Sequence, residues 1–199
     1  MIVGDAVTLH PGDVILYNHL QSLGYTVTLL TDDIATPADA NGQDVVYVST
    51  TTDSNVLGTA MRNVFVPVII SESNLYGYMG MTGTTQGIDF GETDSLQNTM
   101  QIVDPAHPLA AGFSGLTTVY TAQNHLRWGL PTSSADVIAL TDDGNSRIAF
   151  FAYESGASMV GLNAPARRVG FFLATTSGAN LNSTGFQILD ATISWAIGP

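Results

Sequence analysis

"VPVIISESNLYGYMG", residues 66–80, is the stretch of the sequence that decides the fold. Its apolar run ends at Ile70, and Ser71, Glu72 and Ser73 follow before an aromatic, glycine-rich segment. A short, continuous apolar run of this kind is typical of a strand that is buried on both faces of a parallel sheet. A lone carboxylate between two serines at the end of such a strand indicates either a functional site or a helix cap.

Other apolar runs of the same kind precede this one, and helical patterns separate them. "YTVTLLT" (25–31) and "DVVYVST" (44–50) predict strands, and the second again ends in small polar residues. Apolar residues at helical spacing predict a helix over Gly12 to Leu23, and "DSNVLGTAMRN" (53–63) predicts a short helix with a capping aspartate. This alternation predicts an α/β fold of three layers, α/β/α, around a mostly parallel, doubly wound sheet.

The second half of the chain is richer in strand patterns, so we expect additional β elements there. Residues 179–197 close the chain with an apolar stripe at helical spacing, and Asn182 or Ser183 is the expected N-cap. No internal repeat or linker divides the sequence, which predicts a single α/β domain over residues 1–199. The strand candidates are residues 99–104, 117–122, 136–141, 147–154, 158–162 and 168–174.

The composition excludes several classes of function. The 199 residues include 17 acidic residues and five arginines, with no lysine and no cysteine, for a formal net charge of -12. Such a surface repels phosphate backbones and anionic lipid, so we expect neither nucleic acid nor a membrane as a partner. Schiff-base chemistry is excluded because it needs a lysine, and thiolate catalysis is excluded because it needs a cysteine. No histidine–glutamate spacing of a metal site occurs either, so we expect no dedicated metal site, while incidental calcium binding to the acidic surface stays open. We also expect no cofactor.

The order of elements resembles the class I glutamine amidotransferase-like fold, which has a flavodoxin-like arrangement, and in particular its ThuA-like branch. "VPVIISES" (66–73) stands where that family has its strand-to-turn nucleophile elbow. "VDPAHPLAAGF" (103–113) resembles the "HP…GL" segment of ThuA-like proteins, and "ARRVGFFLATTSGANL" (166–181) resembles their late strand and final helix. Similar modules occur within large secreted bacterial proteins, beside carbohydrate-binding domains.

The chain departs from this family at the residues that carry its chemistry. Amidotransferases place a cysteine at the elbow, where this chain has Glu72, and a histidine after the late strand, where it has Ala174, Thr175 and Thr176. Without a thiolate to attack and a base to activate it, glutamine hydrolysis by that mechanism is excluded.

Candidate site residues follow from the predicted topology. In open α/β sheets, ligands bind outside the carboxyl ends of the strands, where the strand order switches. We expect several connecting loops to meet there. The candidates are Asp5 and His10, Ser49 and Thr50, Ser71, Glu72 and Tyr76, together with Glu154 if its strand points the same way.

Glu72 admits three roles: a carboxylate near a helix N-terminus, a ligand hydrogen-bond acceptor, or a catalytic acid, base or nucleophile. If Asp5 or Glu154 lies about 5–9 Å from it, the pair has glycosidase geometry. Partial burial at the strand end would raise the pKa of Asp5, although a turn or cap role is the simpler interpretation.

Ser71 and the tyrosines admit weaker hypotheses. Ser71 is a serine nucleophile only if His10 faces it, and the esterase elbow G-x-S-x-G is not met. Tyr76 and Tyr78 would stack on a sugar ring beside the elbow, or belong to a short helix and its connector.

Two functions follow as hypotheses. The first is a ThuA-like module of a secreted bacterial protein, without glutaminase activity, that binds a saccharide or packs against neighbouring domains of a larger protein. The second is a small hydrolase, a glycosidase with Glu72 and Asp5 or Glu154, or less favourably a Ser71 esterase. The polar, lysine-free composition suits an extracellular or secreted setting. The strand that begins the chain is short, so we expect a domain of a longer protein, and a homodimer stays open.

Overall fold

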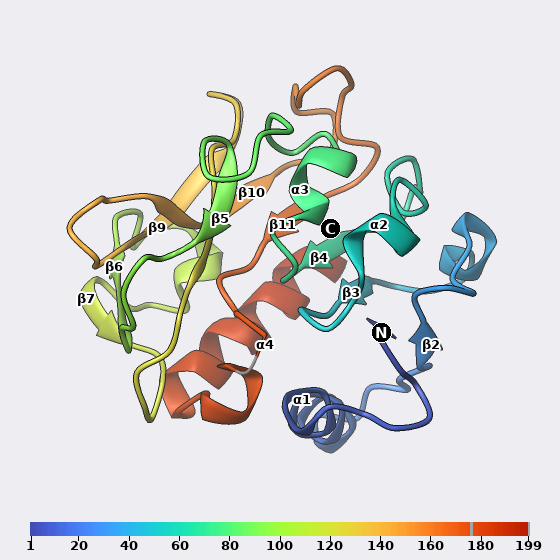
Figure 1. The fold of residues 1–199 in the computed structure, drawn as a ribbon, viewed down its shortest axis with the longest axis horizontal. Helices are drawn as coiled ribbons and strands as arrows, with labels where there is room; N and C mark the ends of the chain where they lie inside the picture. The colour runs from blue at the N-terminus through green and yellow to red at the C-terminus, as the bar shows by residue number, and fades with distance from the viewer. Residues whose placement is uncertain (176, 199) are drawn as a thin grey trace.

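The computed structural model describes residues 1–175 and 177–198. Within them, a nine-stranded mixed sheet runs in the order β2-β1-β3-β4-β11-β10-β9-β6-β7 (Figure 1). The strands from β2 to β11 in this order are parallel to one another. They are β1 (Ile2–Val3), β2 (Leu30–Thr31), β3 (Val46–Val48), β4 (Val68–Ile70) and β11 (Arg168–Gly170).

The other half of the sheet is antiparallel. The strand β10 runs opposite to β11, and each further strand runs opposite to its neighbour. These strands are β6 (Thr99–Ile102), β7 (Gly115–Thr118), β9 (Asp136–Thr141) and β10 (Ile148–Tyr153). A separate ribbon pairs β5 (Phe90–Glu92) with β8 (Arg127–Gly129). The mixed sheet confirms the predicted α/β class with extra β elements in the second half.

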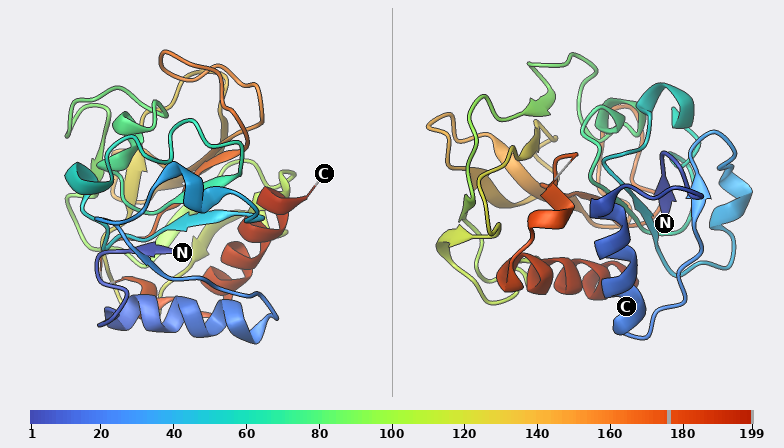
Figure 2. Two further views of the ribbon diagram at one scale, coloured as in Figure 1. Left: turned by 90° about the vertical axis from the view of Figure 1, so that its right-hand side faces the viewer. Right: turned by 60° about the horizontal axis from the view of Figure 1, so that its bottom comes forward.

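Helices cover both faces of the sheet, and the strands alternate their side chains between them. Ile69 of β4 packs in one core with α1 (Pro11–Ser22) and α4 (Ser183–Ile197). Ile70, the next residue, packs in the other core with α2 (Ser54–Leu57) and α3 (Leu75–Tyr78). Figure 2 shows α1 (blue) and α4 (red) next to each other on one side of the sheet. The 3-10 helices are η1 (Pro37–Ala40), η2 (Pro108–Ala110) and η3 (Ser177–Asn180).

Capping residues set the ends of the long helices. His10 precedes α1, and its Nδ1 accepts a hydrogen bond from the Gly12 N–H at 3.2 Å. Asn182 precedes α4 and accepts from the Gly185 N–H at 2.9 Å, so Asn182, of the two expected residues, is the N-cap. None of the described helices combines the length and the apolarity that crossing a membrane requires.

Several predicted elements are shorter than expected or absent. In the stretch 25–31, the described strand is Leu30–Thr31, and the helix predicted over 53–63 ends at Leu57. The strand predicted over 158–162 is wrong, since that segment forms a turn closed by an isolated bridge between Ser158 and Asn163. Gly161 has a positive φ of 78° there, which interrupts an extended strand.

Candidate functional site

The carboxyl ends of the parallel strands meet along one edge of the sheet. Val48, Ile70 and Gly170 lie side by side in register at the ends of β3, β4 and β11. The residues that follow them, beginning with Ser49 and Ser71, therefore converge at this edge, as ligand sites do in open α/β sheets.

Glu72 lies almost completely buried at this edge, with 4% of its surface exposed. Its Oε1 accepts a hydrogen bond from the Asn74 N–H at 3.0 Å, and its main-chain oxygen accepts from the Leu75 N–H at 3.0 Å. The carboxylate thus closes the turn that leads from β4 into α3, which is the capping interpretation of this residue.

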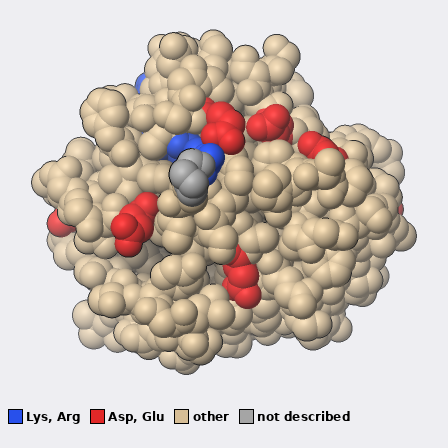
Figure 3. All heavy atoms as spheres, turned by 180° about the vertical axis from the view of Figure 1, so that it is seen from behind, with Lys and Arg blue, Asp and Glu red and all other residues tan. Residues whose placement is uncertain are grey.

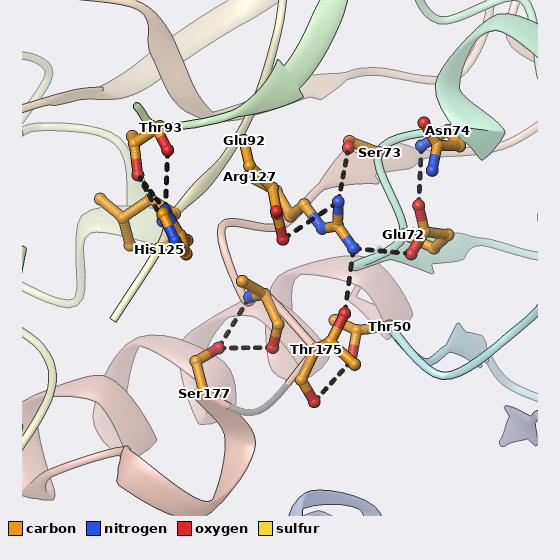
Figure 4. Close-up of polar contacts among 12 residues, drawn as sticks. Thr50, Glu72, Ser73, Asn74, Glu92, Thr93, His125, Arg127, Thr175 and Ser177 are labelled. Atoms are coloured by element: carbon orange, nitrogen blue, oxygen red, sulfur yellow. Dashed lines mark hydrogen bonds and ion pairs between the residues drawn. The ribbon is translucent and has the colours of Figure 1, made fainter. Parts of the chain in front are cut away.

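Arg127 of β8 reaches across the edge to this carboxylate (Figure 4). Its Nη2 donates to Glu72 Oε2 at 2.9 Å and to the Thr175 hydroxyl at 3.2 Å. Its Nη1 lies 3.2 Å from Glu92 Oε1 and 3.5 Å from the Ser73 hydroxyl. One guanidinium therefore joins β5, the β4 elbow and the loop after β11.

Contacts of the Arg127 main chain and of the His125 ring hold β8 in this position. The Arg127 N–H donates to the Phe172 carbonyl at 2.9 Å, just beyond the end of β11. His125, two residues earlier, lies 2.7 Å through its Nδ1 from the Thr93 carbonyl (Figure 4). The ribbon of β5 and β8 is thus anchored over the edge of the sheet, and it carries Arg127 with it.

Burial dominates the electrostatics of this network. Desolvation raises the pKa of Glu72 above its ordinary value of 4.5, and the attraction of Arg127 and the Asn74 N–H offset this in part. The charge of Glu92 raises the pKa of Glu72 further. The Nε of Arg127 is buried and has no hydrogen-bond partner among the described residues. Two carboxylates therefore share one cation that is itself incompletely bonded.

This arrangement leaves Glu72 poorly placed for chemistry. A general acid or base must come within hydrogen-bond reach of the reacting atom. One oxygen of Glu72 accepts from the Asn74 N–H, and the other accepts from Arg127. A substrate would first have to displace an ion pair that is buried on both sides.

The other two candidate carboxylates do not join Glu72 in this network. Asp5 follows β1, and its exposed side chain accepts from the N–H groups of Val7 and Thr8, at 2.8 and 2.9 Å. These bonds lower the pKa of Asp5, in contrast to the rise expected from burial at a strand end. Asp5 is thus a turn residue.

Glu154 lies at the opposite edge of the sheet, which corrects its expected place at the site. The strand before it, β10, is antiparallel to β11, so its carboxyl end meets the amino end of β11. There Glu154 Oε2 accepts from Arg167 Nε at 2.8 Å. A catalytic pair of Glu72 and Glu154 is therefore ruled out by the topology.

Ser71 and His10 likewise bond to different partners. The Ser71 hydroxyl lies 2.7 Å from the Tyr47 hydroxyl, and Ser71 is fully buried. His10 uses its Nδ1 to cap α1. Ser71 therefore pairs with the buried phenol of Tyr47. Burial raises the pKa of this phenol above its ordinary value.

Ser49 and Thr50 make contacts within the protein at the same edge. Ser49 donates to Asp13, a buried carboxylate in the first turn of α1, and Thr51 donates to the same carboxylate at 2.7 Å. The Thr50 hydroxyl donates to the Thr175 carbonyl at 3.4 Å. These side chains join β3, α1 and the loop after β11.

Tyr76 belongs to the core. It is 0% exposed, and its ring packs edge-on against Phe151 with centroids 5.3 Å apart. Its hydroxyl lies 3.4 Å from the Phe171 carbonyl. A ligand therefore has no access to the ring of Tyr76.

A cleft of about 590 Å³ opens beside the elbow, between α2 and α3, which neighbour each other in Figure 1. Tyr78, of α3, is 38% exposed at this cleft, and its hydroxyl donates to Asn55 Oδ1 at 3.0 Å. The lining consists mainly of hydroxyl and amide side chains. The lining residues are Ser54, Asn55, Thr59, Arg62, Asn74, Gly77, Tyr78, Thr84, Gln86 and Phe90.

The sequence pattern did not identify Arg127 or this cleft. Arg127 lies in "NHLRW" (124–128), a segment with no clear strand or helix pattern. One signal was present, because a chain of 17 acidic residues has just five arginines, and each cation is then a candidate partner for a buried carboxylate. Among the described residues, no group of three or more histidine, aspartate or glutamate side chains could hold a metal ion.

Comparisons with known proteins find similarity at the level of the fold. No family model matches the chain, and no curated protein matches it by sequence. Among solved structures, a protein named as a GMP synthase subunit from Thermoplasma acidophilum has a TM-score of 0.63 at 12% identity, covering 98% of this chain and 92% of that one. A cytoplasmic protein from Salmonella typhimurium has a TM-score of 0.61 at 11% identity, covering 92% and 86%. A protein named as ThuA-like from Bacteroides uniformis has a TM-score of 0.54 at 10% identity, covering 98% and 89%.

These neighbours confirm the flavodoxin-like, amidotransferase-like arrangement of the fold. In the resemblance to amidotransferases, Glu72 stands at the elbow of the missing cysteine, and Ala174 and Thr175 stand in the region of the missing histidine. Thr176, the third residue of that region, lies outside the described residues. Arg127 bonds to both Glu72 and Thr175, so a guanidinium bridges the two segments that the resemblance compares with those missing residues.

Proposed function

We propose that the chain is a ThuA-like module of amidotransferase fold that binds a saccharide in the cleft between α2 and α3 and lacks glutaminase activity. The observation that carries the proposal is the cleft itself, with Tyr78 half-exposed on a lining of hydroxyl and amide groups. Aromatic faces pack on the apolar C–H surface of sugars, while hydroxyls and amides bond their hydroxyl groups.

The contacts of Arg127 support the absence of catalysis at the elbow. The guanidinium occupies the space between Glu72 and Thr175 and engages Glu72 Oε2. The site that performs chemistry in the resembling family is thus closed by an ion pair, while the neighbouring cleft is open. The proposal includes a secreted setting within a larger protein, which the acidic, lysine-free composition suits.

The test is a screen of immobilised glycans followed by calorimetry on each glycan that binds. The wild-type protein is compared with Tyr78→Ala, which removes the exposed ring from the cleft. Tyr17→Ala is the matched control, because Tyr17 is a partly exposed tyrosine on α1 whose hydroxyl also bonds an amide, that of Gln21 at 2.8 Å. We expect Tyr78→Ala to weaken binding about tenfold, which corresponds to the ~1.4 kcal/mol typical of an aromatic contact.

Equal loss in both variants, or no glycan bound by the wild type, would contradict the proposal. The alternative is a small hydrolase that uses Glu72, with Asp5 as its predicted partner. Turnover of nitrophenyl glycosides that disappears in Glu72→Gln would favour that alternative over a binding module.

A further inference from the structure

The cleft between α2 and α3 contains a positive charge without a negative one. Arg62 lines it, and no aspartate or glutamate is among the described residues that do so. This is unusual for a chain with a formal net charge of -12, in which acidic residues outnumber basic ones by more than three to one. Figure 3 shows that uncharged residues cover most of the rear face of the molecule, with acidic side chains scattered across it.

The other four arginines already have partners inside the protein. Arg127 pairs with Glu72 and Glu92, Arg147 with Asp94 at 2.9 Å, and Arg167 with Glu154 at 2.8 Å. The guanidinium of Arg168 is fully buried and donates to the main-chain carbonyls of Arg62, Val64, Val66, Ala166 and Arg167.

The guanidinium of Arg62 has no such partner. Within residues 1–175 and 177–198, no carboxylate or carbonyl accepts a hydrogen bond from its side chain, although its main chain bonds to Thr59 and Arg168. Its Nη2 passes close to Gly80 and Gly161, where added Cβ atoms would lie 3.3 and 3.8 Å away. The two glycines leave room for the guanidinium beside the cleft.

The acidic side chains nearest in sequence to the lining residues accept hydrogen bonds from main-chain N–H groups. Asp53 accepts from the Asn55 N–H at 2.9 Å and caps α2. Asp89 accepts from the Thr85 N–H at 2.8 Å. Neither belongs to the lining, and neither forms an ion pair with Arg62 within the described part of the chain.

We infer that the cleft takes a saccharide that carries an acidic group, either a carboxylate or a sulfate, and that Arg62 binds this group. The inference rests on the proposed function and names its ligand class. An arginine fork binds a planar carboxylate or a sulfate oxygen pair with charge-assisted hydrogen bonds. The amide and hydroxyl groups of Asn55, Asn74 and Gln86 line the same cleft and can bond the sugar hydroxyls.

The net negative charge of the protein opposes such a ligand, but only at a distance. At physiological ionic strength the Debye length is about 8 Å, so remote acidic residues are largely screened. A contact between Arg62 and the ligand is screened much less, because the two charges touch. At physiological salt, the attraction between Arg62 and the ligand therefore outweighs the repulsion by remote acidic residues. At very low salt this repulsion is no longer screened, so we expect weaker binding than the Arg62 contact alone would give.

The experiment compares ligands that differ in this charge. Calorimetry at 150 mM salt, chosen for a Debye length of about 8 Å, measures binding of an oligogalacturonate, its neutral methyl ester and a sulfated oligosaccharide. The variants are Arg62→Gln and, as a matched control, Arg147→Gln, whose arginine pairs with Asp94 away from the cleft lining. Melting curves check that both variants are folded.

We expect the wild type to bind at least one acidic ligand about tenfold or more tightly than the methyl ester, in line with a charge-assisted contact. Arg62→Gln should abolish this preference, so that the acidic ligand binds no more tightly than its ester, while Arg147→Gln should keep it. A preference for oligogalacturonate over the sulfated ligand identifies the carboxylate, and the reverse identifies the sulfate.

Equal binding of acidic and neutral ligands by the wild type, or a preference that survives in Arg62→Gln, overturns the inference. In either case saccharide binding itself still stands. Failure of every glycan to bind contradicts the proposed function itself, so the two failures are distinguishable.

Discussion

The guanidinium of Arg127 and the carboxylate of Glu72 lie 2.9 Å apart at the carboxyl edge of the sheet, although 55 residues separate them in the chain. Both side chains are almost completely withdrawn from water, at 10% and 5% exposure. Removing one partner of such a pair leaves an uncompensated buried charge, which costs more than the pair contributes. The elbow of this protein is therefore held by a contact that catalysis would have to break.

We predict that Arg127→Met destabilises the protein by about 3–5 kcal/mol, because it leaves Glu72 and Glu92 facing each other without a cation. Glu72→Gln should cost less, about 1–3 kcal/mol, because Arg127 keeps Glu92 and the amide still accepts a hydrogen bond. Denaturant unfolding of both single variants and of the double variant measures these values.

The double variant should cost clearly less than the sum of the two single changes. The glutamine at position 72 removes one of the two carboxylate charges that Arg127→Met leaves without a cation. Arg147→Gln is the control, because Arg147 pairs with an Asp94 that is 73% exposed and stacks on Trp128, and these contacts together should contribute about 1–2 kcal/mol. Additive costs for Arg127 and Glu72 would contradict the network.

The pH dependence of stability gives a second prediction. Burial raises the folded-state pKa of Glu72 above 4.5, so the folded state binds more protons than the unfolded state just above that pH. The contribution of Glu72 to stability is therefore present at low pH and is lost as pH rises from 4.5 through the folded pKa.

The free energy of unfolding of the wild type minus that of Glu72→Gln, measured from pH 4 to 7, should thus fall as pH rises. A difference that grows with pH would mean that the attraction of Arg127 exceeds the desolvation of Glu72, and would reverse the assigned direction.

The fold was largely predictable because its signals are local. The apolar run up to Ile70 and the patterns around it indicated a parallel, doubly wound sheet, and the polar residues after it lie at the expected edge. Strand direction in the second half is a different matter. Hydrophobic patterns carry no direction, so nothing in residues 147–154 revealed that β10 runs antiparallel and places Glu154 at the far edge.

The candidate site was less predictable because it depends on long-range contacts. Glu72 was identified from its position after β4, but its partner lies on a ribbon that folds back over the sheet. Tyr76 and Tyr78 are two residues apart, but Tyr76 lies in the core and Tyr78 is exposed at the cleft. A four-residue helix shows too little periodicity to tell its faces apart from sequence.

The bond between Tyr47 and Ser71 gives a third prediction. Ser71→Ala should cost about 1–3 kcal/mol because it leaves the buried Tyr47 hydroxyl without this partner. Adding Tyr47→Phe should recover most of that cost, since neither polar group then remains. We also expect no labelling of Ser71 by a fluorophosphonate probe, and labelling at Ser71 would revive the esterase hypothesis.

Gly170 and Phe151 give the last prediction. They lie directly opposite each other in β11 and β10, and a Cβ on Gly170 would lie 2.4 Å from the ring of Phe151. That ring is fully buried and also lies close to Gly129 of β8, where an added Cβ would be 3.0 Å away. Gly170→Ala therefore forces the ring toward the ribbon that carries Arg127, and overpacking of this kind costs about 1–3 kcal/mol.

Phe151→Leu removes the obstructing ring atoms, so in its background Gly170→Ala should cost much less than in the wild type. Unfolding free energies of the two single variants and the double variant measure this coupling. If Gly170→Ala costs the same in both backgrounds, the glycine is required by the main chain of β11 and not by the ring beneath the site. Reduced coupling between Arg127 and Glu72 in Gly170→Ala would show that this core contact sets the position of the elbow network.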